Sequence, residues 1–199
     1  MADWLSGKRR GALALGLGAV AALGQAPLGF WWATLAALAT LVWLLEQVSD
    51  RRGTFLTGLL AGTGYFAVTL NWIIEPFLID VAATGWMAPF AVVFLSLGLG
   101  LFWGGSALLA WLMPNRVLGF VVAFVALEWL RGVIFTGFPW AMLGHVWIGT
   151  PLDQMAALGG PTLLSLVTLF GAVLPVLWRW KGAAGSVLIL GAGLGFGLW

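Results

Sequence analysis

Long apolar runs separated by short polar segments dominate the pattern of the chain. An α-helix needs about 20 apolar residues to cross a hydrocarbon core of roughly 30 Å. Seven runs approach or exceed this length, and they predict helices over residues 11–26, 28–45, 54–74, 87–113, 117–135, 161–178 and 182–199. The pattern therefore predicts an all-α integral membrane protein, a polytopic bundle of about seven transmembrane helices forming a single domain over residues 1–199.

The stretch over residues 136–160 is also apolar, but helix-breaking and polar residues interrupt it. These interruptions are Pro139, Gly144, His145, Gly149, Pro151 and Asp153. Because glycine and proline mark turns and loops, we interpret this stretch as an outer loop that is re-entrant or interfacial. Proline suits the first position of a helix, so Pro161 is predicted to begin the next span.

The N-terminal run has a second interpretation, because Lys8, Arg9 and Arg10 precede it as in a signal peptide. A signal peptide ends at a cleavage site of small residues. A site within residues 22–26 would be followed directly by Pro27, and further spans come after it. We therefore favour a retained first helix.

The distribution of positive charge predicts how the helices cross the membrane. Cytoplasmic loops of membrane proteins carry an excess of lysine and arginine. With the N-terminus inside and seven spans, eight of the nine basic residues are cytoplasmic, and only Arg131 lies outside. A crossing by residues 138–158 would instead expose Arg179 and Lys181 and bury Asp153. The charges thus favour a cytoplasmic N-terminus and an external C-terminus.

Composition supports the membrane class and limits the chemistry. Hydrophobic residues make up 62% of the chain and charged residues 8%, whereas soluble domains carry about 25% charged residues. The net charge is +2, but the basic residues are spread over loops and helix ends. A nucleic-acid partner, which requires a basic patch or stripe, is not predicted.

Few residues offer catalytic or metal-binding chemistry. The sequence contains no cysteine and one histidine, His145, so thiol nucleophiles and multi-histidine metal sites are excluded. We predict no metal and no cofactor, and we expect His145 to be a satisfied interfacial group. Glu75 and Asp80 lie in a polar connection and are best explained as solvated carboxylates.

Small residues recur along several predicted spans at the spacing that lets membrane helices pack closely. Gly58 and Gly62 form one such stripe, and others comprise Ser96, Gly100 and Gly104, and Gly191, Gly193, Gly195 and Gly197. Among 29 glycines some matches arise by chance. We favour packing within the bundle over self-association.

A carboxylate and a guanidinium stand near the end of the predicted span 117–135. Glu128 and Arg131 are three residues apart, so on a helix they share a face and can pair. Ionisable groups at membrane depth are costly unless they are paired or hydrated, and they mark functional sites by default. The alternative is an ordinary charge pair whose ends reach the interface. The spacing alone leaves both interpretations open.

Several short motifs resemble one protein family. Glu128-Trp129-Leu130-Arg131-Gly132 is followed by Thr136-Gly137-Phe138-Pro139-Trp140 and Gly144, while Gly64-Tyr65-Phe66 and Asn71-Trp72 occur in the third span. Together they closely resemble the membrane region of bacterial apolipoprotein N-acyltransferase, and the resemblance covers nearly the whole chain. It implies candidates for a substrate entrance or for structural roles: Tyr65, Asn71, Trp72, Glu128, Trp129, Arg131, Thr136, Gly137, Phe138, Pro139 and Trp140.

The resemblance also implies a location and an activity. Members are multi-pass proteins of the bacterial inner membrane. They take an acyl chain from phospholipid onto a catalytic cysteine and pass it to the N-terminal amine of a diacylated lipoprotein. A Glu-Lys-Cys triad for this chemistry lies in an outward-facing, nitrilase-like domain that follows the helices, and a last helix then returns to the cytoplasm.

Here the chain stops at Trp199, where the resemblance places that domain. Without cysteine, and with Lys8 and Lys181 predicted to be cytoplasmic, no triad can be assembled from these residues. We expect no catalytic residue in this chain and no activity from it alone, whether it is truncated or completed by a separate catalytic chain.

A second function class remains open, that of a non-enzymatic small membrane protein such as a transporter or an assembly subunit. Transporters typically have polar sites at mid-membrane and internal repeats. The two halves of this sequence do not resemble each other, and its ionisable residues are interpreted as clustering at one interface.

Overall fold

The computed structural model describes residues 7–198, apart from the side chain of Phe135, and this part of the chain forms helices and turns without a strand. In chain order the helices are α1 Gly7–Ala22, α2 Trp31–Glu46, α3 Arg51–Thr69, η1 Asn71–Leu78, α4 Val81–Thr84, η2 Gly85–Met87, α5 Ala88–Trp111, α6 Arg116–Val133, η3 Ile134–Thr136, η4 Leu143–Trp147, η5 Pro151–Met155 and α7 Ala156–Phe196.

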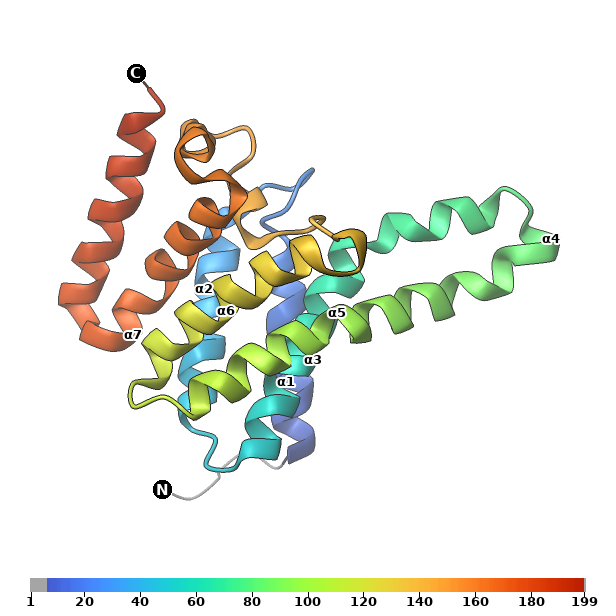
Figure 1. Ribbon diagram of the computed structural model, residues 1–199, viewed down its shortest axis with the longest axis horizontal. Coiled ribbons are helices and arrows are strands. Elements are labelled where there is room, and N and C mark those ends of the chain that lie inside the picture. Colours follow the sequence, from blue (N-terminus) through green and yellow to red (C-terminus); the bar gives the residue numbers. More distant parts are fainter. Residues whose placement is uncertain (1–6, 199) are drawn as a thin grey trace.

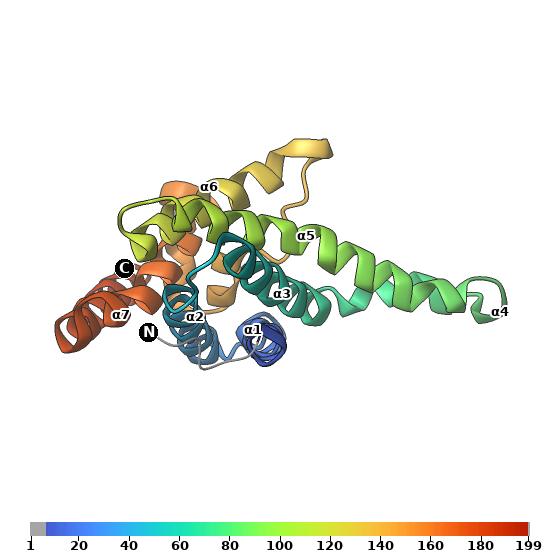
Figure 2. The same ribbon diagram turned by 90° about the horizontal axis from the view of Figure 1, so that it is seen from below.

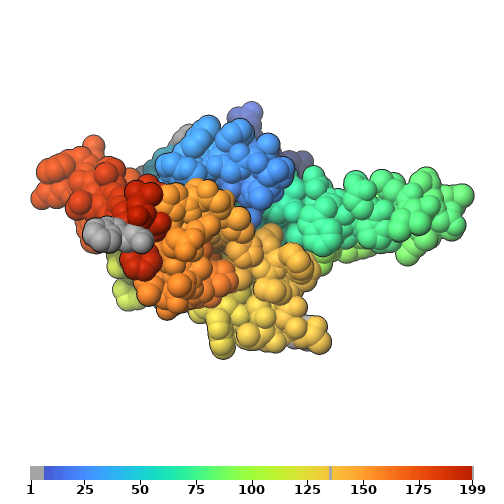
Figure 3. Space-filling view, turned by 90° about the horizontal axis from the view of Figure 1, so that it is seen from above, coloured from blue at the N-terminus to red at the C-terminus, as the bar shows by residue number. Residues whose placement is uncertain are grey.

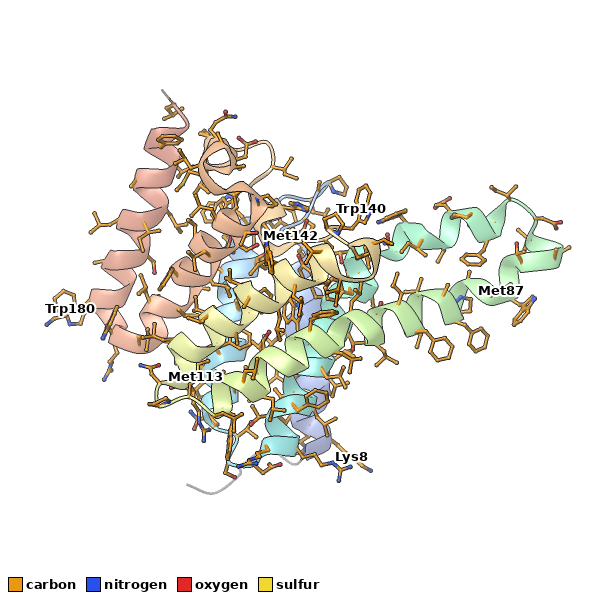
Figure 4. All side chains as sticks on the ribbon, in the orientation of Figure 1. Lys8, Met87, Met113, Trp140, Met142 and Trp180 are labelled. Carbon is orange, nitrogen blue, oxygen red and sulfur yellow. The ribbon has the colours of Figure 1, made fainter. Side chains whose placement is uncertain are left out.

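Helices α1, α2 and α3 run up and down beside one another, and α5, α6 and α7 complete the bundle (Figure 1). Helix α3 packs between α1 and α5, whereas α7 packs against α2 and α6. Figure 2 shows the same arrangement from below, with α3 lying between α1 and α5. Lys8 lies at the opposite end of the bundle from Trp140 (Figure 4). Following the predicted topology, we call the Trp140 end the outer end.

Glycines bring α3 and α5 into direct backbone contact. A Cβ added at Gly62 would lie 2.8 Å from the Trp103 Cβ and 2.9 Å from the Gly100 Cα. A Cβ at Gly58 would lie 3.1 Å from the Gly104 Cα. The two small-residue stripes therefore face each other inside the bundle, which is the packing that the sequence predicted for them.

Two glycines test this contact against a matched control. We expect Gly62→Ala to lower the free energy of unfolding by about 1–3 kcal/mol, because the methyl group has no space. Gly98→Ala on α5 has no neighbour within 4 Å of the added carbon. It should be neutral or stabilising by up to about 1 kcal/mol, since alanine is the better helix former. Denaturant titration in detergent measures both, and equal losses would contradict the packing.

Helix α7 contains two legs that run in opposite directions (Figure 1). Its backbone leaves helical geometry at Trp178 and again at Arg179, where φ is 52°. A Cβ at Gly182 would collide with the carbonyl oxygen of Leu174, so glycine permits the close approach of the two legs. The reversal falls between the predicted spans 161–178 and 182–199.

By length and composition, fewer than seven helices of the structure qualify as membrane spans. Residues Val81–Trp111 and Pro151–Phe196 are long and apolar enough to cross a membrane. The pair Arg51–Thr69 and Asn71–Leu78 adds a third candidate if its 49° bend lies within one span. The described residues thus form an all-helical structure with two or three candidate membrane spans, and the number of seven stays a prediction.

An arm formed by η1, α4, η2 and the first turns of α5 projects sideways from the bundle (Figures 1 and 3). None of the residues in η1, α4 and η2 is buried. Apolar side chains are nevertheless exposed along it, namely Leu78, Ile79, Val81, Trp86, Phe90 and Phe94, with Ile79 at 88%. Such a surface suits lipid rather than water as its solvent.

Candidate functional site

Glu128 and Arg131 lie near the end of α6, at the outer end of the bundle. Arg131 Nη2 is 3.8 Å from Glu128 Oε1, and the two side chains are 3% and 6% exposed respectively. A charge pair that reaches the interface needs exposed ends, and these values do not fit that interpretation. The pair is instead enclosed by protein.

Arg131 holds the turn that follows α6. Its Nη1 donates hydrogen bonds to the carbonyl oxygens of Phe138 at 2.7 Å and Trp140 at 2.8 Å. The Phe138 backbone N–H donates in return to the Arg131 carbonyl at 3.0 Å. The guanidinium also lies 5.2 Å from the centroid of the Phe66 ring on α3. Arg131 therefore fixes residues 138–140 against the end of α3.

Glu128 holds the next part of the same segment. Its Oε1 accepts a hydrogen bond of 2.7 Å from the backbone N–H of Leu143. The N–H of Gly144 donates to the Ser165 hydroxyl of α7 at 2.8 Å. Buried backbone groups outside regular structure need such partners. Side chains of α6 and α7 supply them here, so the segment keeps a defined path without long helices.

The turn itself contains backbone conformations that favour glycine. Thr136, Gly137 and Ala141 have φ values of 73°, 84° and 53°. At Gly137 a Cβ would also collide with the carbonyl oxygen of Gly132. Non-glycine residues in this region cost about 1–3 kcal/mol and persist where their surroundings fix them. The contacts of Glu128 and Arg131 provide that fixation.

Gln25 ties the segment to the first loop and to α3. Its Nε2 lies 2.5 Å from the Tyr65 hydroxyl and donates to the carbonyl oxygen of Met142 at 3.0 Å. Tyr65 is fully buried, and its ring centroid lies 5.1 Å from that of Trp103. Three elements distant in sequence therefore meet at one glutamine amide.

Trp147 anchors the far side of the segment in the core. Its side chain is 1% exposed, and its Nε1 donates to the Thr168 hydroxyl at 2.7 Å. Its ring centroid lies 5.3 Å from that of Trp31 on α2. The segment over residues 137–148 is thus fixed at both ends.

These contacts build one wall of a pocket of about 370 Å³ at the base of the arm. Its lining combines apolar and polar side chains: Gln25, Ala26, Thr69, Leu70, Trp72, Trp140, Ala141, His145 and Ile148. The rings of Trp72 and Trp140 meet edge to face, with centroids 6.0 Å apart. Figure 4 shows Trp140 near the start of the arm. The volume and mixed lining are typical of a ligand pocket.

His145 contributes a neutral ring to this pocket. Burial lowers the pKa of His145, and the positive charge of Arg131 lowers that pKa further. At neutral pH the imidazole therefore offers one hydrogen-bond donor and one acceptor. None of the described lining residues is a carboxylate, a lysine or a cysteine.

The candidate residues that the sequence indicated lie in three different places in the structure. Trp72 and Trp140 line the pocket, and Asn71 begins η1 beside it. Trp129, at 56% exposure, lies outside the site. The others form the turn or support it from behind: Tyr65, Glu128, Arg131, Thr136, Gly137, Phe138 and Pro139.

Sequence reasoning missed Gln25, Met142 and Ser165, and it gave His145 only an interfacial role. Gln25 is the one amide in an apolar junction between two spans, and Ser165 stands in an apolar helix. A polar residue in such surroundings is the signal that was available. Met142 contributes only its backbone carbonyl, which leaves no trace in the sequence.

The fold and site define an all-helical class of protein with candidate membrane spans and a pocket of mixed lining at the outer end. A family model described as the N-terminal domain of apolipoprotein N-acyltransferase matches residues 17–174. A Caulobacter vibrioides protein named apolipoprotein N-acyltransferase is 45% identical over 180 residues, which cover 84% of this chain and 33% of that protein. A Brucella melitensis protein of the same name is 34% identical over 214 residues, which cover 98% of this chain and 40% of that protein.

The chain belongs to the apolipoprotein N-acyltransferase family and corresponds to its N-terminal region. The family indicated by the sequence motifs is thereby confirmed. The chain spans about a third of the length of the curated relatives that it matches. The Allorhizobium ampelinum protein is a further example. It is 37% identical over 187 residues, which cover 87% of this chain and 35% of that protein.

Proposed function

We propose that this chain forms the membrane domain of an enzyme that moves an acyl chain from phospholipid to the N-terminal amine of a diacylated lipoprotein. The proposal places it in the bacterial inner membrane, with its N-terminus in the cytoplasm and its C-terminus outside. A thiolate must come from beyond these 199 residues, because they contain no cysteine. It comes either from the rest of a longer polypeptide or from a separate chain.

The observation that carries the proposal is the pocket at the base of the arm. Leu70, Trp72, Trp140 and Ile148 offer apolar surface for acyl chains, while Gln25 and His145 offer hydrogen bonds for ester or peptide groups. The apolar arm beside it suits contact with lipid. The pocket therefore has the mixed chemistry that an amphipathic lipid substrate requires.

In this proposal Glu128 and Arg131 position the wall of the pocket and carry out no proton chemistry. Their hydrogen bonds go to backbone groups of Phe138, Trp140 and Leu143 rather than into the pocket. Ionic groups of this kind preorganise a binding surface. Their proposed role is to keep Trp140 opposite Trp72.

Photo-crosslinking tests this function with a matched pair of tryptophans. Trp140 is 59% exposed and lines the pocket, whereas Trp129 is 56% exposed and does not. With benzoylphenylalanine at each position, we expect a labelled diacylated lipopeptide to react several-fold more at position 140. That adduct should saturate and be competed by unlabelled lipopeptide. Equal, unsaturable labelling at both positions would show surface contact with lipid and contradict the proposal.

A further inference from the structure

An open groove of about 430 Å³ separates α2 from the inner turn of α7. Its walls are Ala39, Thr40 and Trp43 from α2 and Pro175, Val176 and Arg179 from α7. The Thr40 hydroxyl is used within α2, where it donates to the Ala36 carbonyl at 2.8 Å. The groove is therefore largely apolar, and Arg179 is the one charged residue in its described lining.

Arg179 occupies a backbone conformation that is unfavourable for arginine. Its φ and ψ are 52° and −125°, a region in which glycine is the usual residue. Strain of this kind points to a functional reason for the side chain. The turn needs a residue in this conformation, and the residue at this position is a cation that lines the groove.

The lining of the groove carries one positive charge, that of Arg179. Lys181 lies in the same turn, with its Nζ 5.7 Å from the centroid of the Trp180 ring, and Trp180 points away from the bundle (Figure 4). No described residue lining the groove is acidic. Glu46, one turn beyond Trp43, lines a different cavity together with Arg116. An anion in the groove would thus meet one lining cation, Arg179, and no lining carboxylate.

We propose that this groove binds a phospholipid with a net negative headgroup from the inner leaflet. One acyl chain lies along α2 and Pro175, and the phosphate oxygens accept hydrogen bonds from Arg179. Basic pockets between membrane helices on the cytoplasmic side are suited to such headgroups, and the guanidinium fork matches the phosphate geometry. This lipid is separate from any substrate at the outer end.

Lipid-dependent thermal stability of the purified chain tests the site. Phosphatidylglycerol added to detergent micelles should raise the melting temperature by several degrees, since a ligand that binds only the folded state stabilises it. Phosphatidylcholine and inorganic phosphate should each give less than half of that gain. Arg179→Gln should lose most of the gain, while Arg52→Gln, at an exposed position in the first turn of α3, should keep it.

Arg179→Gly separates binding from folding. Glycine relieves the backbone strain, so this variant should melt at the wild-type temperature or above it without lipid, and should still lose the gain from phosphatidylglycerol. Native mass spectrometry should find fewer retained phosphatidylglycerol molecules on both Arg179 variants. Equal losses in Arg179→Gln and Arg52→Gln, an equal gain from phosphatidylcholine, or a full gain from inorganic phosphate would each overturn the proposal.

Discussion

Leucine in place of Arg131 is expected to lower the free energy of unfolding by about 3–5 kcal/mol, because it leaves Glu128 buried without its counter-charge. The change also removes the donor to the carbonyl oxygens of Phe138 and Trp140. Glu128→Gln should also lower the free energy of unfolding. Its amide oxygen still accepts from Leu143, but Arg131 then loses its only described carboxylate partner within 4.0 Å.

The double variant distinguishes a buried pair from two independent residues. Its loss should fall short of the sum of the single losses by at least about 1 kcal/mol, since neither charge remains unpaired. Recovery should be partial, because Phe138 and Trp140 still lack a donor. Arg52→Leu, an exposed cation, should stay within about 0.5 kcal/mol of the wild type. Additive losses in the denaturation cycle would refute the coupled pair.

The second large effect is an absence of activity. The purified 199-residue chain, in vesicles with phospholipid and a diacylated lipopeptide, is expected to produce no N-acylated peptide. Acyl transfer through a covalent intermediate needs an activated nucleophile, and the sequence supplies no thiol. Mass spectrometry of the peptide measures the result, with the intact Caulobacter vibrioides relative as the positive control. Acylation above a protein-free blank would contradict this expectation.

The spacing of Glu128 and Arg131 was enough to predict that they share a helix face, because helical geometry is local. The groups that they hold were not predictable in the same way. Leu143, Phe138 and Trp140 are bound through backbone atoms of an irregular segment. Its path depends on Gln25 and Ser165, which lie far away in sequence and meet it only in the folded chain.

Trp129 belongs to the same sequence motif as Glu128 and Arg131, but the motif did not show that its side chain lies outside the site. It lies between Glu128 and Arg131 in sequence, but adjacent positions on a helix point in different directions. Trp129 is consequently exposed while its charged neighbours are buried. Periodicity can show that such residues diverge, but it does not show which direction faces the pocket.

The arm could not be predicted from the sequence, and the reason is different. The predicted span 54–74 runs past Thr69, where α3 ends and the chain bends by 49° into η1. In a membrane protein the surface in contact with lipid is as apolar as the core. Hydropathy therefore identifies the length of an apolar run but does not distinguish a helix inside the bundle from an arm that projects into lipid.

A chimera tests most directly whether this chain is the membrane domain of an N-acyltransferase. Residues 1–199 would be joined to the C-terminal remainder of the Caulobacter vibrioides relative and produced in a bacterium depleted of its own enzyme. We expect mass spectrometry to find N-acylated lipoprotein with the chimera and none with residues 1–199 alone. A chimera that reaches the membrane at the level of the intact relative, yet leaves lipoproteins diacylated, would contradict it.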